Sequence, residues 1–139
     1  MKNAIKLFLI LSVICSGFSW ATPNAMPAKP SSNICDSEFH YSEIGKKELT
    51  KVSADKTAFV IDVNSAESFK KNHVTNAVHF ESIRGQFAKS LPTDKNKLIV
   101  AYCGGPKCGA WMKAASEACK LGYKNIKHYK GGIQGWVKN

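Results

Sequence analysis

The stretch that decides the fold reads Lys97-Leu98-Ile99-Val100-Ala101-Tyr102-Cys103-Gly104-Gly105-Pro106-Lys107-Cys108-Gly109. Its first part, residues 97–102, is nearly all apolar, which is typical of a strand buried on both faces in a parallel sheet. Its second part, residues 103–109, is rich in glycine and predicts a tight loop. A helical pattern over residues 110–121 follows directly and ends at Gly122, a residue type that often terminates helices.

The flanking sequence repeats this alternation of strand and helix. Residues 57–63 form a second apolar run, and shorter strands are expected at residues 39–41, 77–80 and 125–129. Helices are expected at residues 43–52, capped by Ser42, at residues 66–71, opened by Ser65, at residues 82–89, and as a last turn around Trp136. The pattern predicts an α/β fold with a mostly parallel five-stranded sheet and helices on both faces.

The first 21 residues have the pattern of a secretory signal peptide. Lys2 and Lys6 precede an uncharged apolar run at residues 7–14, and small residues, Ser19 and Ala21, occupy the −3 and −1 positions of a cleavage site. The alternative is a membrane anchor, but residues 7–21 are short for a span and contain several polar or small residues. We expect cleavage after Ala21 and a periplasmic or secreted protein without a membrane attachment.

The remaining chain divides into a lead-in and one domain. Residues 22–33 are rich in Pro, Ala, Ser and Asn without periodicity, which predicts a disordered segment. Residues 34–139 have the length and apolar content of a single folded domain.

Positive charge exceeds negative charge throughout the chain. The sequence has 20 basic and 10 acidic residues, and removal of residues 1–21 leaves 18 basic residues and a net charge of +8. This charge favours anionic partners, such as a small anion, nucleic acid or a membrane surface. The lysines are scattered and form no stripe with interleaved aromatic residues, so the sequence does not predict nucleic-acid binding.

Cys103 is the candidate nucleophile because it follows a buried strand and precedes a helix. In open α/β sheets, ligands bind at the carboxyl ends of the strands. The helix N-terminus, the loop amides and Lys107 all favour the thiolate, so we expect the pKa of Cys103 to lie below its reference of about 8.5. Gly104 and Gly105 allow amide groups to turn inward without a Cβ atom in the way. The alternative is a structural cysteine beside an ordinary turn.

These residues resemble the family of rhodanese-like sulfurtransferases over about residues 39–136. Residues 59–63 resemble the first signature strand with its aspartate, Asp62, and residues 98–103 resemble the strand that leads to the active cysteine. Further matches to the family pattern are Glu67, Phe69, His73, Ala77, residues 121–123, Gly131, Gly132 and Trp136.

The resemblance implies a persulfide mechanism that needs no cofactor. Cys103 would take the outer sulfur of an anionic donor such as thiosulfate and pass it to a thiol or cyanide-like acceptor, or to a protein acceptor. The binding loop would comprise Gly104, Gly105, Pro106, Lys107, Cys108 and Gly109. Asp62 would support the loop from beneath. Related phosphatase and arsenate-reducing loops are longer and need an arginine, whereas the only arginine here, Arg84, lies far upstream.

Four residues depart from the family pattern. Asn64 stands where an arginine usually follows, which would loosen an ion pair with Asp62. Asn72 and Asn76 replace glycines, and asparagine tolerates the left-handed conformation better than most residues. Cys108 occupies a position often held by Arg or Thr, which leaves the preferred donor open.

The other cysteines leave alternatives open. Cys108 either stays reduced or forms a disulfide with Cys103, to resolve the persulfide or to make the protein a thiol–disulfide exchanger. Cys35 and Cys119 are candidates for a structural disulfide. The cysteine spacing matches no common zinc pattern, so no metal is expected. A non-catalytic sulfur carrier is a further alternative. The histidines His40, His73 and His128 are expected to be surface or packing residues, and Trp111 either borders the pocket or covers the sheet.

Overall fold

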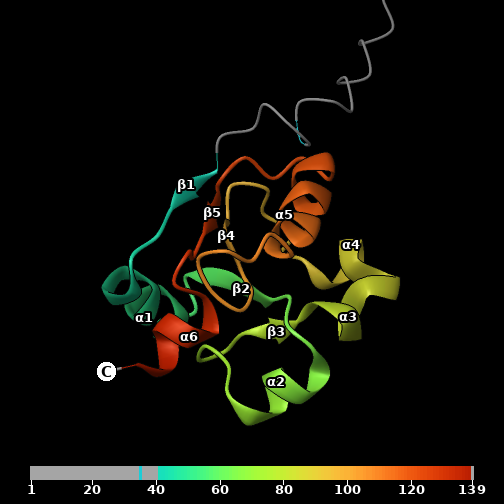
Figure 1. The fold of residues 1–139 in the computed structure, drawn as a ribbon. Helices are drawn as coiled ribbons and strands as arrows, with labels where there is room; N and C mark the ends of the chain where they lie inside the picture. The colour runs from blue at the N-terminus through green and yellow to red at the C-terminus, as the bar shows by residue number, and fades with distance from the viewer. Residues whose placement is uncertain (1–34, 36–40, 139) are drawn as a thin grey trace, which may run out of the picture.

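A five-stranded sheet with all neighbouring strands parallel forms the centre of the molecule (Figure 1). The computed structural model describes residue 35 and residues 41–138. The strand order is β1-β5-β4-β2-β3. The strands are β1 (Ser42–Glu43), β2 (Ala58–Asp62), β3 (Val78–His79), β4 (Leu98–Tyr102) and β5 (Ile126–His128). The α/β fold with a parallel five-stranded sheet, expected from the sequence, is confirmed.

The two apolar runs of the sequence form the middle of the sheet. Strands β2 and β4 pair along their full lengths, from Ala58 opposite Leu98 to Asp62 opposite Tyr102. Successive side chains alternate between the two faces of a strand. Ile61 accordingly packs in one core and Val60 in the other, and both are buried. Both faces of these strands are therefore covered.

Helices form a layer on each face (Figure 1). Helices α1 (Lys46–Ala54) and α6 (Gly132–Val137) pack on one face through residues such as Leu49 and Ile133. Helices α3 (Phe80–Ile83), α4 (Phe87–Ser90) and α5 (Trp111–Lys120) pack on the other. Helix α2 (Ala66–Lys71) lies beside β3 and has no buried residue. It begins as predicted after Ser65, whose Oγ accepts a hydrogen bond from the Ser68 amide at 3.2 Å.

The start of the domain differs from the prediction. Ser42 does not cap a helix, because it belongs to β1 and pairs with Lys127 of β5. The Ile44 amide also donates to the His128 carbonyl at 3.0 Å. These sheet hydrogen bonds hold the backbone extended, so α1 begins only at Lys46, after Gly45.

The helix expected at residues 82–89 is broken into three pieces. Helix α3 ends at Ile83, a 3-10 turn, η2 (Arg84–Gln86), follows, and α4 begins at Phe87. Phe80 and Phe87 are both buried and meet edge to face, with ring centroids 5.3 Å apart. The break around Gly85 places both rings in the same core. Burial of the two rings therefore outweighs the local preference for a continuous helix.

Several predictions fall on residues outside the described part of the chain. They are the signal peptide at residues 1–21, the lead-in at residues 22–33, the domain start at residue 34, and residues 39 and 40 of the first expected strand. Among residues 35 and 41–138, no helix is long and apolar enough to cross a membrane.

Candidate active site

The loop that contains Cys103 leaves the carboxyl end of β4, in the interior of the sheet, and leads into α5. It lies against α6, as Figure 1 shows near the centre of the view. This position matches the general rule that ligands of α/β sheets bind beyond the carboxyl ends of the strands.

Helix α6 holds the first two residues of the loop by their carbonyl groups. The Ile133 amide donates to the Cys103 carbonyl at 2.8 Å, and the Gln134 amide donates to the Gly104 carbonyl at 3.0 Å. Gly132 makes this approach possible. A Cβ atom there would lie 2.5 Å from the Cys103 carbonyl oxygen, and its φ of 57° is in the left-handed region that favours glycine. These contacts fix the direction of the loop as it leaves β4.

Cys108 folds back over Cys103 within the same loop. The Cys108 amide donates to the Gly105 carbonyl at 3.0 Å, which closes a tight turn. The sulfur atoms of Cys103 and Cys108 are joined, at 2.35 Å, in a disulfide. Cys103 is only 1% exposed, whereas Cys108 is half-buried. In this oxidised state neither sulfur is a nucleophile, so the thiolate expected at Cys103 requires reduction of the pair.

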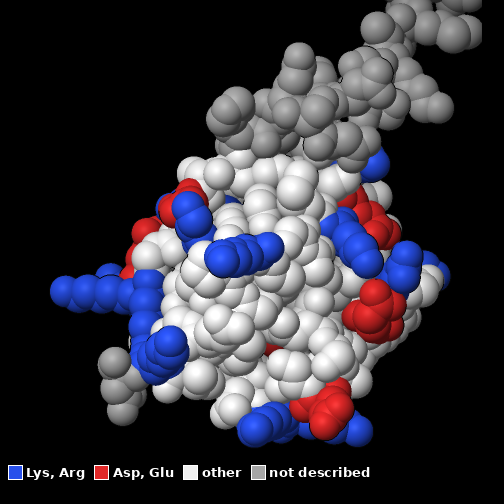
Figure 2. All heavy atoms as spheres, viewed as in Figure 1, with Lys and Arg blue, Asp and Glu red and all other residues white. Residues whose placement is uncertain are grey.

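A pocket of about 480 Å³ opens above the loop, lined by Gly104, Gly105, Pro106, Lys107, Cys108 and Gln134. Among the described residues, the amides of Gly104, Gly105, Lys107 and Gly109 are not donors in any hydrogen bond. Unpaired amides in a glycine-rich loop are the kind of group that binds small anions. Figure 2 shows that this side of the molecule has a broad uncharged area, with most lysines and acidic residues toward its edges.

Asp62 lies at the carboxyl end of β2, fully buried next to β4. Its Oδ2 accepts a hydrogen bond from the Tyr102 hydroxyl at 2.5 Å, and that hydroxyl accepts from the Val74 amide at 2.9 Å. Burial raises the pKa of Tyr102 far above its ordinary value, and the hydrogen bond to Asp62 raises it further. Tyr102 therefore stays protonated and serves as a fixed donor to the carboxylate.

Asn64 fills the place of the expected arginine. Its backbone amide and its Nδ2 donate to Asp62 Oδ1 at 2.8 and 2.7 Å. The Asn64 side-chain oxygen also lies 3.8 Å from the Cβ position of Gly104. Two hydrogen bonds from Asn64 thus take the place of an ion pair, and the same side chain lies beside the start of the Cys103 loop.

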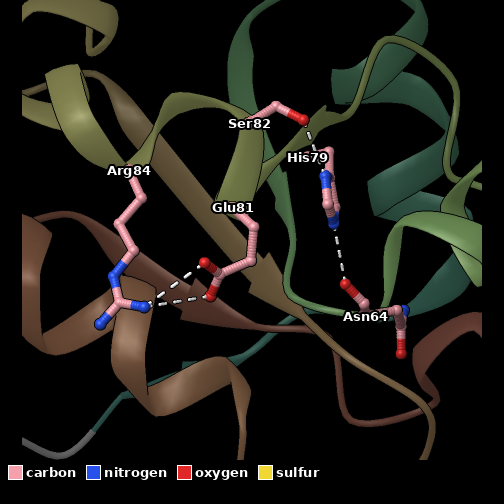
Figure 3. Close-up of polar contacts among 5 residues, drawn as sticks. All are labelled: Asn64, His79, Glu81, Ser82 and Arg84. Carbon is pink, nitrogen blue, oxygen red and sulfur yellow. Dashed lines mark hydrogen bonds and ion pairs between the residues drawn. The ribbon is translucent and has the colours of Figure 1, made fainter.

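His79 anchors Asn64 from the other side (Figure 3). Its Nε2 lies 2.9 Å from the Asn64 carbonyl oxygen, and its Nδ1 lies 2.8 Å from Ser82 Oγ. A carbonyl only accepts, so Nε2 carries the proton, and in the neutral ring Nδ1 accepts from the Ser82 hydroxyl. The sequence analysis assigned His79 no role. The available signal was its place at the end of β3, next to the end of β2.

Gln134 was also missed by the sequence analysis. Its side-chain Oε1 would lie 2.8 Å from a Cβ at Gly105, and it closes one side of the pocket. The only hint was its position two residues after the Gly131-Gly132 pair, and only the packing of α6 on the loop brings it to the site.

His128 and Trp111 form a stacked pair behind the loop. Their ring centroids are 3.8 Å apart at an interplanar angle of 9°, and Tyr41 meets Trp111 edge to face. His128 Nε2 is buried without a hydrogen-bond partner in the described chain. Burial lowers the pKa of His128, Lys130 lowers it further, and Glu43 raises it. Trp111 does not line the pocket above the loop, and packs instead against the core that covers the sheet.

The remaining candidate residues lie away from the loop. Arg84 pairs with Glu81 at 3.4 Å on the surface (Figure 3) and lines a different pocket, of about 360 Å³. His73 is exposed and stacks on Phe69. Cys35 and Cys119 are joined by a disulfide, with Cα atoms 5.7 Å apart.

The two asparagines at expected glycine positions behave differently. Asn76 has a φ of 59°, in the left-handed region, and its Nδ2 donates to the Ser53 carbonyl at 2.9 Å. Asn72 is extended, with φ −154°, so the left-handed conformation considered for it is wrong. Among the residues that the structure describes, no group of three or more His, Cys, Asp or Glu side chains could hold a metal ion.

Comparison with known protein families finds a match over most of the described chain. The profile described as "Rhodanese-like domain" matches residues 45–139. Among curated proteins, a tRNA uridine(34) hydroxylase of Buchnera aphidicola is 34% identical over 100 residues, covering 68% of this chain and 30% of that protein. The Prochlorococcus marinus enzyme of the same name is 30% identical over 122 residues, covering 84% of this chain and 37% of its own. The chain therefore spans about a third of the length of these relatives.

Solved structures share the fold. The human single-domain sulfurtransferase TSTD1 superposes with a TM-score of 0.56 at 20% identity, covering 70% of this chain and 96% of its own. The Saccharomyces cerevisiae single-domain sulfurtransferase RDL2 superposes with a TM-score of 0.52 at 19% identity, covering 73% and 92%. At these identities the likeness concerns the fold alone.

Proposed function

Since the chain belongs to the family of rhodanese-like domains, we propose that it is a sulfurtransferase that carries sulfur as a persulfide on Cys103. The observation that carries the proposal is the placement of Cys103 at the carboxyl end of β4, beneath a pocket edged by loop amides and Lys107. The finer assignments, thiosulfate as donor and a thiol or cyanide-like molecule as acceptor, are proposed from the resemblance to rhodanese-like sulfurtransferases.

The reaction takes place in two steps once the cysteine pair is reduced. The Cys103 thiolate attacks the outer sulfur of thiosulfate, the sulfur–sulfur bond of the donor breaks, and sulfite leaves with the electron pair. The acceptor then attacks the outer sulfur of the persulfide and regenerates the Cys103 thiolate. Neither step needs a general base once the thiol is ionised.

The loop supports both steps electrostatically. Amides that donate to no described residue can stabilise the thiolate and the transferred sulfur, and Lys107 adds a positive charge at the pocket. Arg84, which pairs with Glu81 at another pocket, is not placed to bind an oxyanion there. This arrangement favours sulfur transfer over phosphate-ester chemistry.

We propose the location and partners of the protein from its sequence. We propose a periplasmic or secreted protein, which the signal-peptide pattern of residues 1–21 supports, with a protein thiol as one acceptor class. We propose no role for nucleic acid, membrane, cofactor or metal. The tRNA hydroxylation named for the longer relatives is not carried over, because the proposal extends only to chemistry that the Cys103 loop supports.

Mass spectrometry of the reduced protein after addition of thiosulfate tests the proposal. We expect thiocyanate formation when cyanide is present together with thiosulfate. We also expect a gain of one sulfur atom on the peptide that contains Cys103 in the Cys108→Ala variant, where no second loop thiol can remove the sulfur. The Cys103→Ser variant should show neither result, whereas Cys35→Ser/Cys119→Ser should form thiocyanate as the wild type does. A reduced wild-type protein that gains no sulfur and forms no thiocyanate would overturn the assignment.

A further inference from the structure

The second cysteine of the loop has a chemical role of its own. We propose that Cys108 attacks the Cys103 persulfide and releases its outer sulfur as hydrogen sulfide. This step joins Cys103 and Cys108 in a disulfide, which a dithiol reductant then reduces. The protein would thus be a dithiol-dependent thiosulfate reductase when no other sulfur acceptor is present. The inference rests on the proposed persulfide at Cys103 and assigns Cys108 the role of a resolving thiol.

The loop backbone brings the two cysteines close together. Their Cα atoms are 6.3 Å apart, within the range that a disulfide spans. The turn closed by the Cys108 amide and the Gly105 carbonyl brings Cys108 back over Cys103. Helix α6 fixes the other end of the turn through the carbonyls of Cys103 and Gly104. Two thiols held in this way react as if at very high concentration.

The two sulfurs differ in their access to solvent. Cys103 is 1% exposed, and Cys108 is half-buried and lines the pocket, so in the oxidised protein Cys108 is the more accessible of the two. A reductant that enters the pocket of the oxidised protein therefore meets Cys108 first. Attack there makes Cys103 the leaving sulfur, in the position where the loop amides favour a thiolate. Reduction through Cys108 thus regenerates the nucleophile needed for the next donor.

The step that releases sulfide needs no reactant beyond the persulfide, the Cys108 thiolate and a proton. The Cys108 thiolate attacks Cys103 Sγ, the inner sulfur of the persulfide. A bond forms between the two cysteine sulfurs, and the bond to the outer sulfur breaks. The outer sulfur leaves with the electron pair as HS⁻ and takes up a proton. The sulfane sulfur is reduced, and the two cysteines are oxidised to the disulfide found in the structure.

The reductant completes the cycle. One thiolate of the dithiol attacks Cys108 Sγ and releases the Cys103 thiolate, and its second thiol then closes the disulfide of the reductant and frees Cys108. Over the whole cycle, thiosulfate and one dithiol give sulfite, hydrogen sulfide and one disulfide. An acceptor that takes the outer sulfur before Cys108 attacks diverts the persulfide into ordinary sulfur transfer.

A single-turnover experiment separates this inference from the proposed function. The full chain is reduced, freed of reductant, diluted to prevent reaction between molecules, and mixed with thiosulfate without an acceptor. We expect the wild-type protein to release one sulfide per chain and to end with Cys103 and Cys108 joined. The variants Cys108→Ser and Cys108→Ala should release no sulfide and keep the extra sulfur on Cys103. The Cys35→Ser/Cys119→Ser control should behave as the wild type.

The possible failures point to different steps. A wild-type protein that keeps its extra sulfur and releases no sulfide overturns the role of Cys108 and leaves sulfur transfer standing. Sulfide release by the two Cys108 variants at the wild-type rate overturns it as well. If neither the wild type nor either Cys108 variant takes up sulfur or releases sulfide, the proposed persulfide itself is wrong, and the inference fails with it.

Discussion

At the scale of single residues, the buried polar groups near the site differ in how completely they are paired. Asp62 accepts hydrogen bonds from Tyr102 and Asn64 and is fully buried. His128 is 8% exposed, and its Nε2 has no partner among the described residues. A buried polar atom without a partner costs free energy, whereas a satisfied one is nearly neutral. We therefore expect His128, and not Asp62, to be the position where an apolar residue is tolerated.

Replacement of His128 by phenylalanine should stabilise the protein by about 1 kcal/mol at pH 7.5, because it keeps the stack on Trp111 and removes the unpaired nitrogen. The pH dependence should change too. The pKa of His128 is lowered in the folded state. As the pH falls below 6.5, the imidazole is therefore protonated more in the unfolded chain than in the folded protein. Wild-type stability should therefore fall as the pH falls below 6.5, and less so in His128→Phe. Urea denaturation at pH 7.5 and 5.5 measures both effects.

Equal slopes of stability against pH in the wild type and in His128→Phe would contradict this prediction. The charged neighbours Glu43 and Lys130 form an ion pair at 3.1 Å on the exposed surface, and both proteins retain it. The comparison therefore isolates the imidazole.

At the scale of elements, the short helix α6 controls the geometry of the Cys103 loop. Its first residues donate to two loop carbonyls, and Gly132 lets the two backbones approach within contact distance. Near the ends of β2 and β3, His79 contacts the Asn64 carbonyl, and the Asn64 side-chain oxygen lies 3.8 Å from the Cβ position of Gly104. The loop thus lies between segments that are distant in sequence.

Replacement of Gly132 by alanine should destabilise the protein by about 2–5 kcal/mol, because the new Cβ meets backbone atoms at 2.5 Å and the positive φ disfavours a side chain. Sulfur transfer through Cys103 should slow as well, since the loop has to shift. Urea denaturation and the rate of thiocyanate formation from thiosulfate and cyanide measure the two effects.

Gly85→Ala is the matched control, because a Cβ atom at Gly85 has nothing within 4 Å and its φ is not positive. It should stay within about 1 kcal/mol of the wild type and keep full sulfur transfer. A Gly132→Ala variant as stable and as reactive as Gly85→Ala would show that α6 does not set the loop geometry.

At the scale of the whole molecule, the disulfide between Cys35 and Cys119 connects the beginning of the described chain to the end of α5. The two cysteines are 84 residues apart in sequence. The Tyr41 hydroxyl donates to the Cys35 carbonyl at 3.0 Å, and its ring meets Trp111 at the start of α5. The link therefore runs along the side of the molecule opposite to α1 and α6.

The double variant Cys35→Ser/Cys119→Ser should lose about 2–5 kcal/mol of stability, because a link across so long a segment restricts the unfolded chain. Its Cys103 loop has no contact with either position and should take up sulfur as in the wild type. Urea denaturation of both proteins without reductant measures the loss. A loss below about 0.5 kcal/mol would show that this link does not contribute to stability.

Elements set by interactions within a few residues were predicted more closely than elements set by packing between distant segments. The bounds of α2 and the strands β2 and β4 were predicted closely, because capping and continuous apolar runs act within a few residues. The cap at Ser42 and the continuous helix at residues 82–89 were wrong, since pairing with β5 and packing of Phe80 on Phe87 override local preference. Export, the donor and the acceptor remain predictions.

The order of apolar and glycine residues along the chain was enough to predict the sheet and the position of Cys103 at the end of a buried strand, and the motifs around them indicated the family. The folded chain was needed to show that Gln134 and Asn64 come close to the loop, that His79 contacts Asn64, and that Cys108 covers Cys103. Such contacts join residues from separate strands and helices, so they depend on the packing of the whole sheet and leave no periodic trace in the chain.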